Sequence, residues 1–256
     1  MELQSMEMQG KVALVTGAGR GIGASIAEAL AAAGADIAVC DVDGEAAAKT
    51  AAALSERHGV RTLGVAADIS DGVAVRAAVA TVLSELGTVD ILVNNAAVDV
   101  IKRFVDSTEE EWDRIISINL RGTITVTRAV LDTMIERGSG TIIHIASDAG
   151  RVGSSGEVVY SATKGGVIAF GKALAREVAR YGITVNTVCP GPTETALLGQ
   201  VAEYSQKMYD ATVRAIPLRR TAEPGEIAGV VAFLASGKAS YMTGQTLSVS
   251  GGLTML

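Results

Sequence analysis

Short runs of apolar, β-branched residues alternate along the whole chain with longer alanine-rich segments whose apolar positions recur every three to four residues. The short runs predict strands, and the long segments predict helices. The strands are expected at residues 11–16, 36–41, 61–68, 89–94, 140–147, 184–189 and 245–250. The helices are expected at residues 21–33, 44–57, 72–86, 109–136, 158–181 and 224–234.

The predicted strands are apolar at nearly every position, which is typical of a parallel sheet covered by helices on both faces. Strands that alternate with helices, joined by right-handed crossovers, favour an α/β fold with a doubly wound, seven-stranded parallel sheet. Its ligand crevice is expected at the carboxyl ends of the strands. The chain has 256 residues, enough for one such domain. We therefore predict a single domain over residues 10–256, preceded by a flexible N-terminus at residues 1–9.

Composition and charge exclude several functional classes. The net charge is −6 and no basic run is present, so we expect no nucleic-acid partner. Cys40 and Cys189 are far apart and form neither a metal motif nor a disulfide framework, which favours a reduced, cytoplasmic location. His144 lies in an apolar run with only His58 as a partner, so it is interpreted as a packing residue and no metal is proposed. The N-terminus lacks an apolar segment that could enter a membrane.

The first strand-to-helix turn, residues 16–23, has the sequence TGAGRGIG. Its glycines allow the backbone to approach a pyrophosphate, and the next helix offers free N–H groups to the anion. This position predicts a dinucleotide site, so the sheet is expected to form a Rossmann fold. Spacing alone leaves the register of the motif open, because Gly19, Gly21 and Ala24 also fit the generic fingerprint.

Asp41 ends the second predicted strand, about 20 residues after the glycine turn. A carboxylate at this place accepts hydrogen bonds from the ribose hydroxyls and repels a 2′-phosphate. We therefore expect NAD as the cofactor. Arg20 favours the alternative, NADP, but no second basic residue follows Asp41.

The candidate chemistry lies between Ser147 and Lys164. Tyr160 and Lys164 are four residues apart, so on a helix they project side by side. A lysine ammonium beside a phenol favours the phenolate, which makes a tyrosine of ordinary pKa about 10 usable as a proton donor and acceptor. The same spacing occurs by chance on solvated helix faces, so the pair alone leaves both interpretations open.

With these motifs in this order, nearly the whole chain resembles the short-chain dehydrogenase/reductase family in its single-domain form. The family's cofactor motif corresponds to Thr16, Gly17, Gly21 and Gly23, which settles the register of the turn. The resemblance implies four catalytic residues, Asn119, Ser147, Tyr160 and Lys164. The cofactor-binding residues expected from the motifs and the resemblance together are Gly17, Arg20, Gly21, Ile22, Gly23, Asp41, Asp68, Ile69, Asn95, Ala96, Tyr160, Lys164, Pro190, Gly191, Thr193 and Thr195.

The resemblance implies an NAD-dependent oxidoreductase that transfers a hydride between a secondary alcohol and the nicotinamide. Tyr160 would exchange the proton, and Ser147 would stabilise charge on the substrate oxygen. Lys164 would lower the pKa of Tyr160 and hold the nicotinamide ribose, while Asn119 would anchor a water that leads to solvent. The resemblance also implies a homotetramer, and the long helices at 109–136 and 158–181 are apolar on more than one side.

The substrate is expected to be selected by the loop after Ser147, the segment after Pro190 and the C-terminus. Substrate contacts are predicted at Asp148, Arg151, Ser154 and Glu157; Arg151 could meet a carbonyl or phosphate, or lie on the surface. The amphipathic segment at residues 192–217 is interpreted as a substrate lid, with ordinary packing as the alternative.

Three runs, IASDAGRVGSSGEVVY, VCPGPTETALL and TGQTLSVSGGLTM, resemble a narrower group, the 2-hydroxycyclohexanecarboxyl-CoA dehydrogenases. That resemblance implies a cyclic hydroxyacyl-CoA as substrate. One alternative is a 3-oxoacyl-thioester reductase, or a sugar, polyol or steroid alcohol dehydrogenase, on the same scaffold. A second alternative, from another class, is a non-catalytic NAD sensor.

Overall fold

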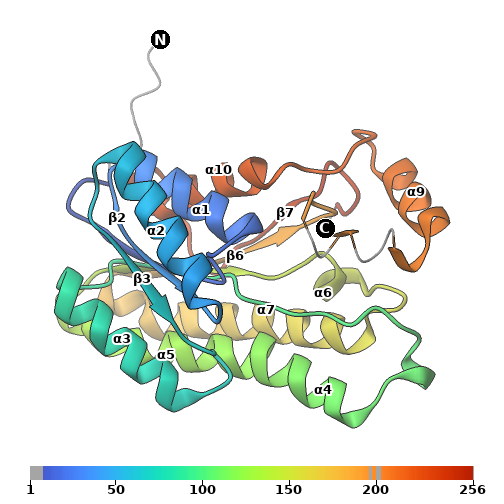
Figure 1. The fold of residues 1–256 in the computed structure, drawn as a ribbon, viewed down its shortest axis with the longest axis horizontal. Coiled ribbons are helices and arrows are strands. Elements are labelled where there is room, and N and C mark those ends of the chain that lie inside the picture. Colours follow the sequence, from blue (N-terminus) through green and yellow to red (C-terminus); the bar gives the residue numbers. More distant parts are fainter. Residues whose placement is uncertain (1–7, 196–197, 200–202, 256) are drawn as a thin grey trace.

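The structure is a computed structural model and describes residues 8–195, 198–199 and 203–255. Its core is one sheet of seven strands in the order β3-β2-β1-β4-β5-β6-β7, and all neighbouring strands are parallel (Figure 1). The strands are β1 (Val12–Thr16), β2 (Asp36–Asp41), β3 (Thr62–Ala66), β4 (Ile91–Asn94), β5 (Gly140–Ile145), β6 (Ile183–Pro190) and β7 (Thr246–Val249). The seven-stranded parallel sheet predicted from the sequence is confirmed.

Helices cover both faces of the sheet. Figure 1 shows α1, α2 and α10 on one face and α3, α5 and α7 on the other. The helices are α1 (Gly21–Ala32), α2 (Gly44–His58), α3 (Gly72–Leu86), α4 (Glu109–Ile116), α5 (Thr123–Arg137), α6 (Ala149–Val152), α7 (Val158–Val178), α9 (Gln206–Ala215) and α10 (Pro224–Ala235). Among the described residues, no helix combines the length and apolar character needed to span a membrane.

The central strand β1 shows why the apolar runs lack alternation. Ala13 and Val15 pack in one hydrophobic cluster with residues of α1 and α10, whereas Val12 and Leu14 pack in a second cluster with residues of α3, α5 and α7. All positions of the strand are buried, and each large apolar side chain contributes about 1.5–3 kcal/mol when fully buried. A sheet buried on both faces therefore selects apolar residues at consecutive positions.

The long helix predicted at residues 109–136 is interrupted. α4 ends at Ile116, a π-helical turn covers Ser117–Gly122, and α5 begins at Thr123. A π turn adds a residue to the helical repeat while the helix continues, so apolar periodicity does not reveal it. The turn places Asn119, which is 1% exposed, in the interior. The helix predicted at residues 158–181 ends at Val178 and continues as a single 3₁₀ turn.

The N-terminal segment is described only in part. Residues 1–7 of the segment predicted to be flexible lie outside the described residues. Met8 is buried, and its amide donates a hydrogen bond of 2.8 Å to the carbonyl of Ala33. The chain is therefore fixed against the end of α1 from Met8 onward.

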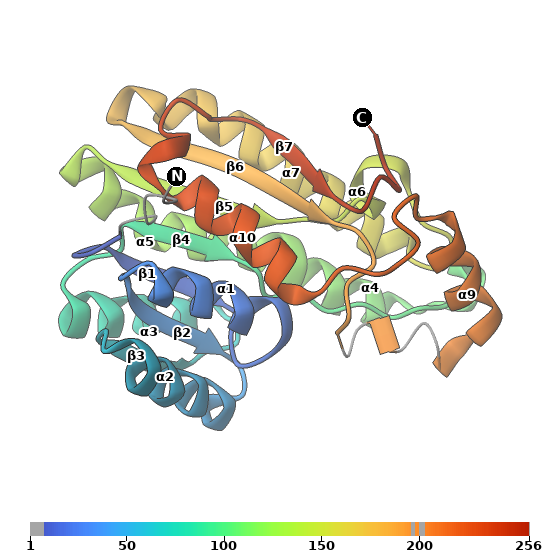
Figure 2. The same cartoon turned by 90° about the horizontal axis from the view of Figure 1, so that it is seen from above.

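The winding of the sheet reverses between β1 and β4, since the chain moves outward to β2 and β3 on one side and to β5, β6 and β7 on the other. At such a switch point the connections diverge and leave a crevice at the carboxyl ends of the strands. Figure 2 shows α9 and the C-terminal residues lying together beyond that edge of the sheet.

The opposite edge of β1 and β4 is held by a buried carboxylate. Asp90 is 4% exposed and accepts hydrogen bonds from the amide of Val12, at 2.9 Å, and from Arg137 of α5, at 3.0 Å. Lys11 lies 3.6 Å from the same carboxylate. Because hydrogen bonds to a charged, buried acceptor are stronger than neutral ones, Asp90 fixes β1, β4 and α5 together.

We expect Asp90→Ala to lower the free energy of unfolding by about 2–3 kcal/mol, because it leaves a buried amide and a guanidinium without their acceptor. Urea unfolding at a fixed protein concentration measures the change. The control is Asp132→Ala, which removes an exposed carboxylate that pairs with Arg128 in the preceding turn of the same helix, and it should change stability little. Equal stability of the two variants would contradict the role of Asp90.

Candidate active site

A cavity of about 920 Å³ lies at the carboxyl edge of the sheet, within the usual size range of ligand pockets. Twenty of the predicted site residues line it. They are Gly17, Arg20, Gly21, Ile22, Gly23, Asp41, Asp68, Ile69, Asn95, Ala96, Ser147, Asp148, Ser154, Glu157, Tyr160, Lys164, Pro190, Gly191, Thr193 and Thr195. Within the described ranges, the other two predicted residues, Asn119 and Arg151, contribute no cavity wall.

The glycine turn between β1 and α1 is too tightly packed for side chains. Gly17 has a left-handed φ of +63°, and a Cβ at this position would lie 2.7 Å from Cα of Ala96. A Cβ at Gly23 would lie 2.2 Å from the carbonyl oxygen of Gly17 and 2.5 Å from Nδ2 of Asn95. The backbone can therefore turn within this space only because both residues are glycine.

The N-terminus of α1 offers free donors to this turn. α2 and α3 are capped by the preceding residues, Asp43 and Asp71, whose side chains accept hydrogen bonds from amides of the first turn. At the start of α1, Arg20 supplies no side-chain cap, and the first turn of this described helix contains no acidic residue. Its N–H groups and positive dipole end are left for an anion, so the turn fits the pyrophosphate of a dinucleotide.

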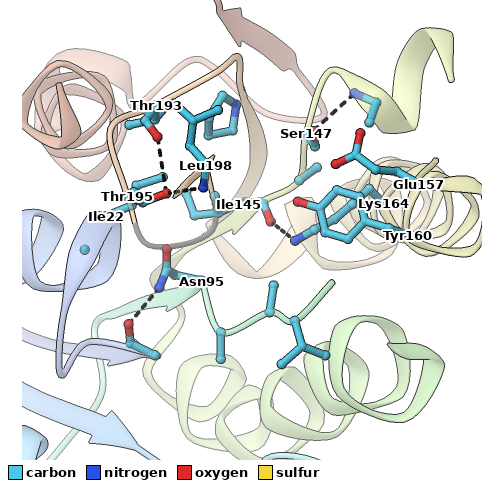
Figure 3. Close-up of a pocket in the computed structure, with 18 of the residues that line it drawn as sticks. Ile22, Asn95, Ile145, Ser147, Glu157, Tyr160, Lys164, Thr193, Thr195 and Leu198 are labelled. Carbon is cyan, nitrogen blue, oxygen red and sulfur yellow. Dashed lines mark hydrogen bonds between the residues drawn. The ribbon is translucent and has the colours of Figure 1, made fainter. Parts of the chain in front are cut away.

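Asn95 fastens the turn to the end of β4. Its side-chain nitrogen donates to the carbonyls of Thr16, at 2.9 Å, and Gly17, at 3.0 Å, and its main-chain amide donates to Oγ1 of Thr16 at 3.0 Å. Figure 3 shows Asn95 at the floor of the cavity. The side chain of Asn95 therefore holds the turn in shape, and the cofactor contact expected at this residue stays a prediction.

Asp41 is fixed by the same turn. Its Oδ2 accepts a hydrogen bond of 2.9 Å from the amide of Gly19, and its Oδ1 accepts one of 3.1 Å from the amide of Asp43. A Cβ at Gly19 would lie 2.9 Å from Oδ2 of Asp41, so the carboxylate can approach only a glycine. The carboxylate therefore has a fixed position at the cavity wall, at the end of β2.

The far wall comes from the segment after β6. Thr193 donates to the carbonyl of Gly191 at 2.9 Å, and Thr195 donates to the carbonyl of Thr193 at 3.2 Å. The amide of Leu198 in turn donates to Oγ1 of Thr195 at 3.3 Å (Figure 3). This chain of hydrogen bonds positions the segment opposite the glycine turn.

Ser147, Tyr160 and Lys164 converge on the cavity from β5 and α7. Tyr160 and Lys164 are 8% and 3% exposed, and the lysine nitrogen lies 5.5 Å from the centre of the tyrosine ring, as their spacing predicts. Nζ of Lys164 donates to the carbonyl of Ile145 at 2.8 Å (Figure 3). Ser147 follows β5, and its hydroxyl accepts the amide of Ala149 at 3.1 Å.

The pKa of Tyr160 is raised rather than lowered. Burial is the main cause, and the charges of Glu157 and Asp99 add to it; only a hydrogen bond with Ser147 acts to lower the pKa. Burial also lowers the pKa of Lys164 to about 8. Burial disfavours the charged form of both groups, so in the protein alone the pKa of Tyr160 is not lowered below its usual value. The effect predicted for Lys164 on this pKa stays a prediction.

Asn119 holds a loop. Its Oδ1 accepts the amide of Val98 at 2.9 Å, and its Nδ2 donates to the carbonyl of Val98 at 2.8 Å. A longer contact of 3.4 Å reaches Oγ1 of Thr163, which donates to the carbonyl of Tyr160 at 2.8 Å. Asn119 thus connects the loop after β4 to the helix that carries Tyr160. The water contact implied by the family resemblance stays a prediction.

The predicted substrate residues separate into two groups. Asp148, Ser154 and Glu157 line the cavity. Arg151 points to β7 instead, where its Nη1 donates to Oγ of Ser248 at 2.6 Å, and Ser248 donates to the carboxylate of Asp148. Arg151 therefore ties α6 to the sheet, a long-range pairing that the local sequence of the loop does not reveal.

Several residues line the cavity although no local sequence pattern predicts that they do. Thr212 and Ala215 of α9 line one side, which agrees with the predicted position of a lid at residues 192–217, although residues 196–197 and 200–202 lie outside the described residues. The wall also includes residues of the loop after β4, α4, the π turn and the C-terminus, namely Ile101, Arg114, Ile118, Leu253 and Thr254. These positions are brought together only by the tertiary fold.

His144 has the role predicted for it. The ring is fully buried, its Nδ1 lies 3.1 Å from Nδ2 of Asn94, and it packs against Phe170 with ring centres 5.5 Å apart. Burial lowers the pKa of His144 to about 3, so the ring is neutral. A neutral histidine within the core is a packing residue.

Comparison with known proteins agrees with this geometry. A family model described as Enoyl-(Acyl carrier protein) reductase matches residues 17–254. The chain is 41% identical over 251 residues to the 3-oxoacyl-(acyl-carrier-protein) reductase FabG of Vibrio harveyi. The matched residues cover 98% of this chain and 100% of that protein. The FabG of Escherichia coli K12 is 41% identical over 252 residues, with the same coverage. The crystal structure of levodione reductase superposes with a TM-score of 0.92 at 34% identity, over 95% of this chain and 97% of that one.

We expect Gly23→Ala to weaken dinucleotide binding by about 10- to 100-fold, because the added Cβ displaces the turn at an overpacking energy of about 1–3 kcal/mol. Fluorescence titration with NADH measures the affinity. The matched control is Gly229→Ala in α10, where no described atom lies within 4 Å of the added Cβ. Undiminished affinity in Gly23→Ala would show that the turn does not hold the dinucleotide.

Proposed function

The chain belongs to the short-chain dehydrogenase/reductase family and is an oxidoreductase that uses a nicotinamide cofactor; from this we propose that it reduces the 3-oxo group of an acyl thioester to a hydroxyl. The observation that carries the proposal is the meeting of Ser147, Tyr160 and Lys164 in one cavity with the glycine turn. When bound, the nicotinamide supplies the hydride.

The residues around the reacting oxygen donate the proton and stabilise the developing charge. A raised pKa keeps Tyr160 protonated at neutral pH, so its phenol is available as a proton donor to the oxygen that forms the alcohol. The hydroxyl of Ser147 stabilises charge that develops on the same oxygen. Lys164, with a pKa of about 8, is mostly charged at neutral pH and can return a proton toward Tyr160. Tyr160 and Lys164 are buried, and Ser147 is half-buried at the cavity wall.

The relatives favour a thioester substrate. The two FabG proteins are named for 3-oxoacyl groups on acyl carrier protein. This supports the 3-oxoacyl-thioester alternative predicted from the sequence over the cyclic hydroxyacyl-CoA of the 2-hydroxycyclohexanecarboxyl-CoA dehydrogenases. Both substrate classes carry an oxygen at the third carbon of an acyl thioester, so the chemistry of the site is the same for either. They differ in the shape of the acyl chain, which the walls built by α6 and α9 would distinguish.

We propose NAD rather than NADP as the cofactor. The carboxylate of Asp41 is held at the cavity wall by the amides of Gly19 and Asp43. A fixed carboxylate can accept hydrogen bonds from two ribose hydroxyls, and a 2′-phosphate at the same place would be repelled. Arg20 lines the cavity and favours NADP.

The homotetramer implied by the family resemblance stays a prediction. Ile116 of α4 and Ile124 of α5 are 43% and 39% exposed on helices that the resemblance assigns to an interface. Their exposure supports the burial of this face by another copy of the chain.

The proposed activity is tested by following NADH and NADPH absorbance with 3-oxoacyl-CoA and 3-oxoacyl-carrier-protein thioesters, cyclic hydroxyacyl-CoA thioesters and simple polyols. We expect turnover of the thioesters. Tyr160→Phe should lose about 10²- to 10⁴-fold in kcat and still bind the cofactor, whereas Tyr181→Phe, far from the cavity, should match the wild type. Full activity of Tyr160→Phe would exclude it as the proton donor. Tight cofactor binding without turnover of any substrate would favour the sensor.

For the cofactor, we expect kcat/KM with NADH to exceed that with NADPH by about tenfold or more, equivalent to about 1.4 kcal/mol. Asp41→Ala should reduce this ratio, because it removes both the ribose acceptor and the repelling charge. Glu45→Ala is the control, since it removes a neighbouring exposed carboxylate outside the cavity wall. A preference for NADPH in the wild type would overturn the assignment.

A further inference from the structure

Two carboxyl groups beside Tyr160 take no part in the mechanism above. Asp99 follows Val98, the residue that Asn119 holds through both of its amide groups. Glu157 precedes α7 and lies three residues before Tyr160. The loop after β4 and the start of α7 are far apart in sequence, and the fold brings their carboxyl groups together.

Asp99 is buried and incompletely paired. It is 9% exposed, and its Oδ1 accepts the amide of Val100 at 2.8 Å. Its Oδ2 is buried as well, and no described residue donates a hydrogen bond to it. A buried carboxylate oxygen without a donor is unfavourable, so this atom requires a proton of its own or a donor from outside the chain.

Glu157 is the group that faces Asp99. Both residues line a second cavity of about 20 Å³ that also includes Tyr160 in its wall, a space for about one water molecule. Glu157 is half-buried and also lines the larger cavity, and Figure 3 shows its carboxyl group beside the ring of Tyr160. Two ionised carboxylates have only acceptor oxygens, so they cannot satisfy each other unless one is protonated.

The surrounding charges do not remove this conflict. Burial and the charge of Glu157 raise the pKa of Asp99 to about 7, and Lys164 lowers it only in part. Lys102 next to the smaller cavity is already paired with Glu111 at 2.6 Å. The other titratable groups at this end of the site are Tyr160, Arg114, Asp148, Arg151 and Cys189, and burial raises the pKa of the Cys189 thiol to about 11, so it is neutral.

We propose that Asp99 and Glu157 share one proton at neutral pH and act as a positioning pair that keeps Tyr160 protonated for carbonyl reduction. The shared proton satisfies Oδ2 of Asp99 and leaves one negative charge on the pair. When the pair loses the proton at higher pH, two charges face Tyr160 and oppose its ionisation more strongly. The pair therefore extends the pH range over which the phenol can donate.

The kinetic test rests on the proposed function and uses the pH profile of kcat for reduction. Activity is lost as pH rises through the pKa of Tyr160, because the donor must be protonated. Above neutral pH, Glu157→Gln and Asp99→Asn each have one negative charge beside Tyr160, whereas the wild type has two. The pKa of Tyr160 is then raised less, so the alkaline limb of the kcat profile should move to lower pH by about half a unit or more. Glu157→Gln is the sharper variant, since Asp99 also raises the pKa of Lys164.

Two further variants separate this role from a structural one. Asp106→Asn is the matched control, because Asp106 lies in the same loop but pairs with Arg103 at the surface; its profile should match the wild type. Glu157→Asp retains the charge and should restore the wild-type limb at least in part. A uniform fall of kcat in Glu157→Gln, with the alkaline limb unmoved, would overturn the proposal.

Infrared difference spectroscopy tests the proton itself without any substrate. The wild type and Asp106→Asn should show the C=O stretch of a buried carboxylic acid at neutral pH, and both Asp99→Asn and Glu157→Gln should lack it. Absence of the band from the wild type would mean two ionised groups bridged by water, and would overturn the shared proton. Because this measurement needs no turnover, a failure of the thioester assignment leaves its result intact.

Discussion

The site depends on one junction, the tie between the glycine turn and the end of β4. At this point the sheet changes its direction of winding, so two strand ends stop side by side and their last carbonyls need donors. Asn95 supplies them to Thr16 and Gly17, and Oγ1 of Thr16 accepts the amides of Asn95 and Ala96 in return. The reciprocal bonds satisfy the backbone and keep the turn open toward the cavity. The same turn then fixes Asp41, so the position of this carboxylate at the cavity wall follows from the junction.

Burial sets the proton chemistry of the site. Removing Tyr160, Lys164 and Asp99 from water favours the neutral form of each, which raises the pKa of the two acids and lowers that of the lysine. The pKa values of Lys164 and Asp99, about 8 and about 7, are thereby close to neutral pH, where a group exchanges protons readily. The phenol remains a donor. An assembly of this kind suits carbonyl reduction, in which the substrate oxygen receives a proton.

The sequence predicts the parts of this molecule that depend on local pattern. β1 is apolar from Val12 to Val15 because helices cover both faces of the sheet, and Tyr160 and Lys164 meet because they are four residues apart on α7. Other features depend on contacts between distant segments. The π turn around Asn119 leaves the apolar repeat intact, Arg151 is drawn to Ser248 on β7, and Asp99 becomes important only when the fold places it beside Glu157. The pKa of Tyr160 is raised because burial and the charges of Glu157 and Asp99 favour the neutral phenol, and none of these causes is visible in the spacing of Tyr160 and Lys164.

The N-terminus of α1 lacks the stabilising cap of its neighbours and is thereby free to bind an anion. An aspartate cap of the kind that begins α2 and α3 contributes about 1 kcal/mol, and the first turn of α1, which the structure describes completely, has none. Gly17 and Gly23 add conformational freedom to the unfolded chain, which also disfavours folding. An anion bound at these amides satisfies them and stabilises only the folded state, by an amount that grows with ligand concentration relative to Kd. The nucleotide site and the stability of the central sheet are therefore coupled through the same few amides.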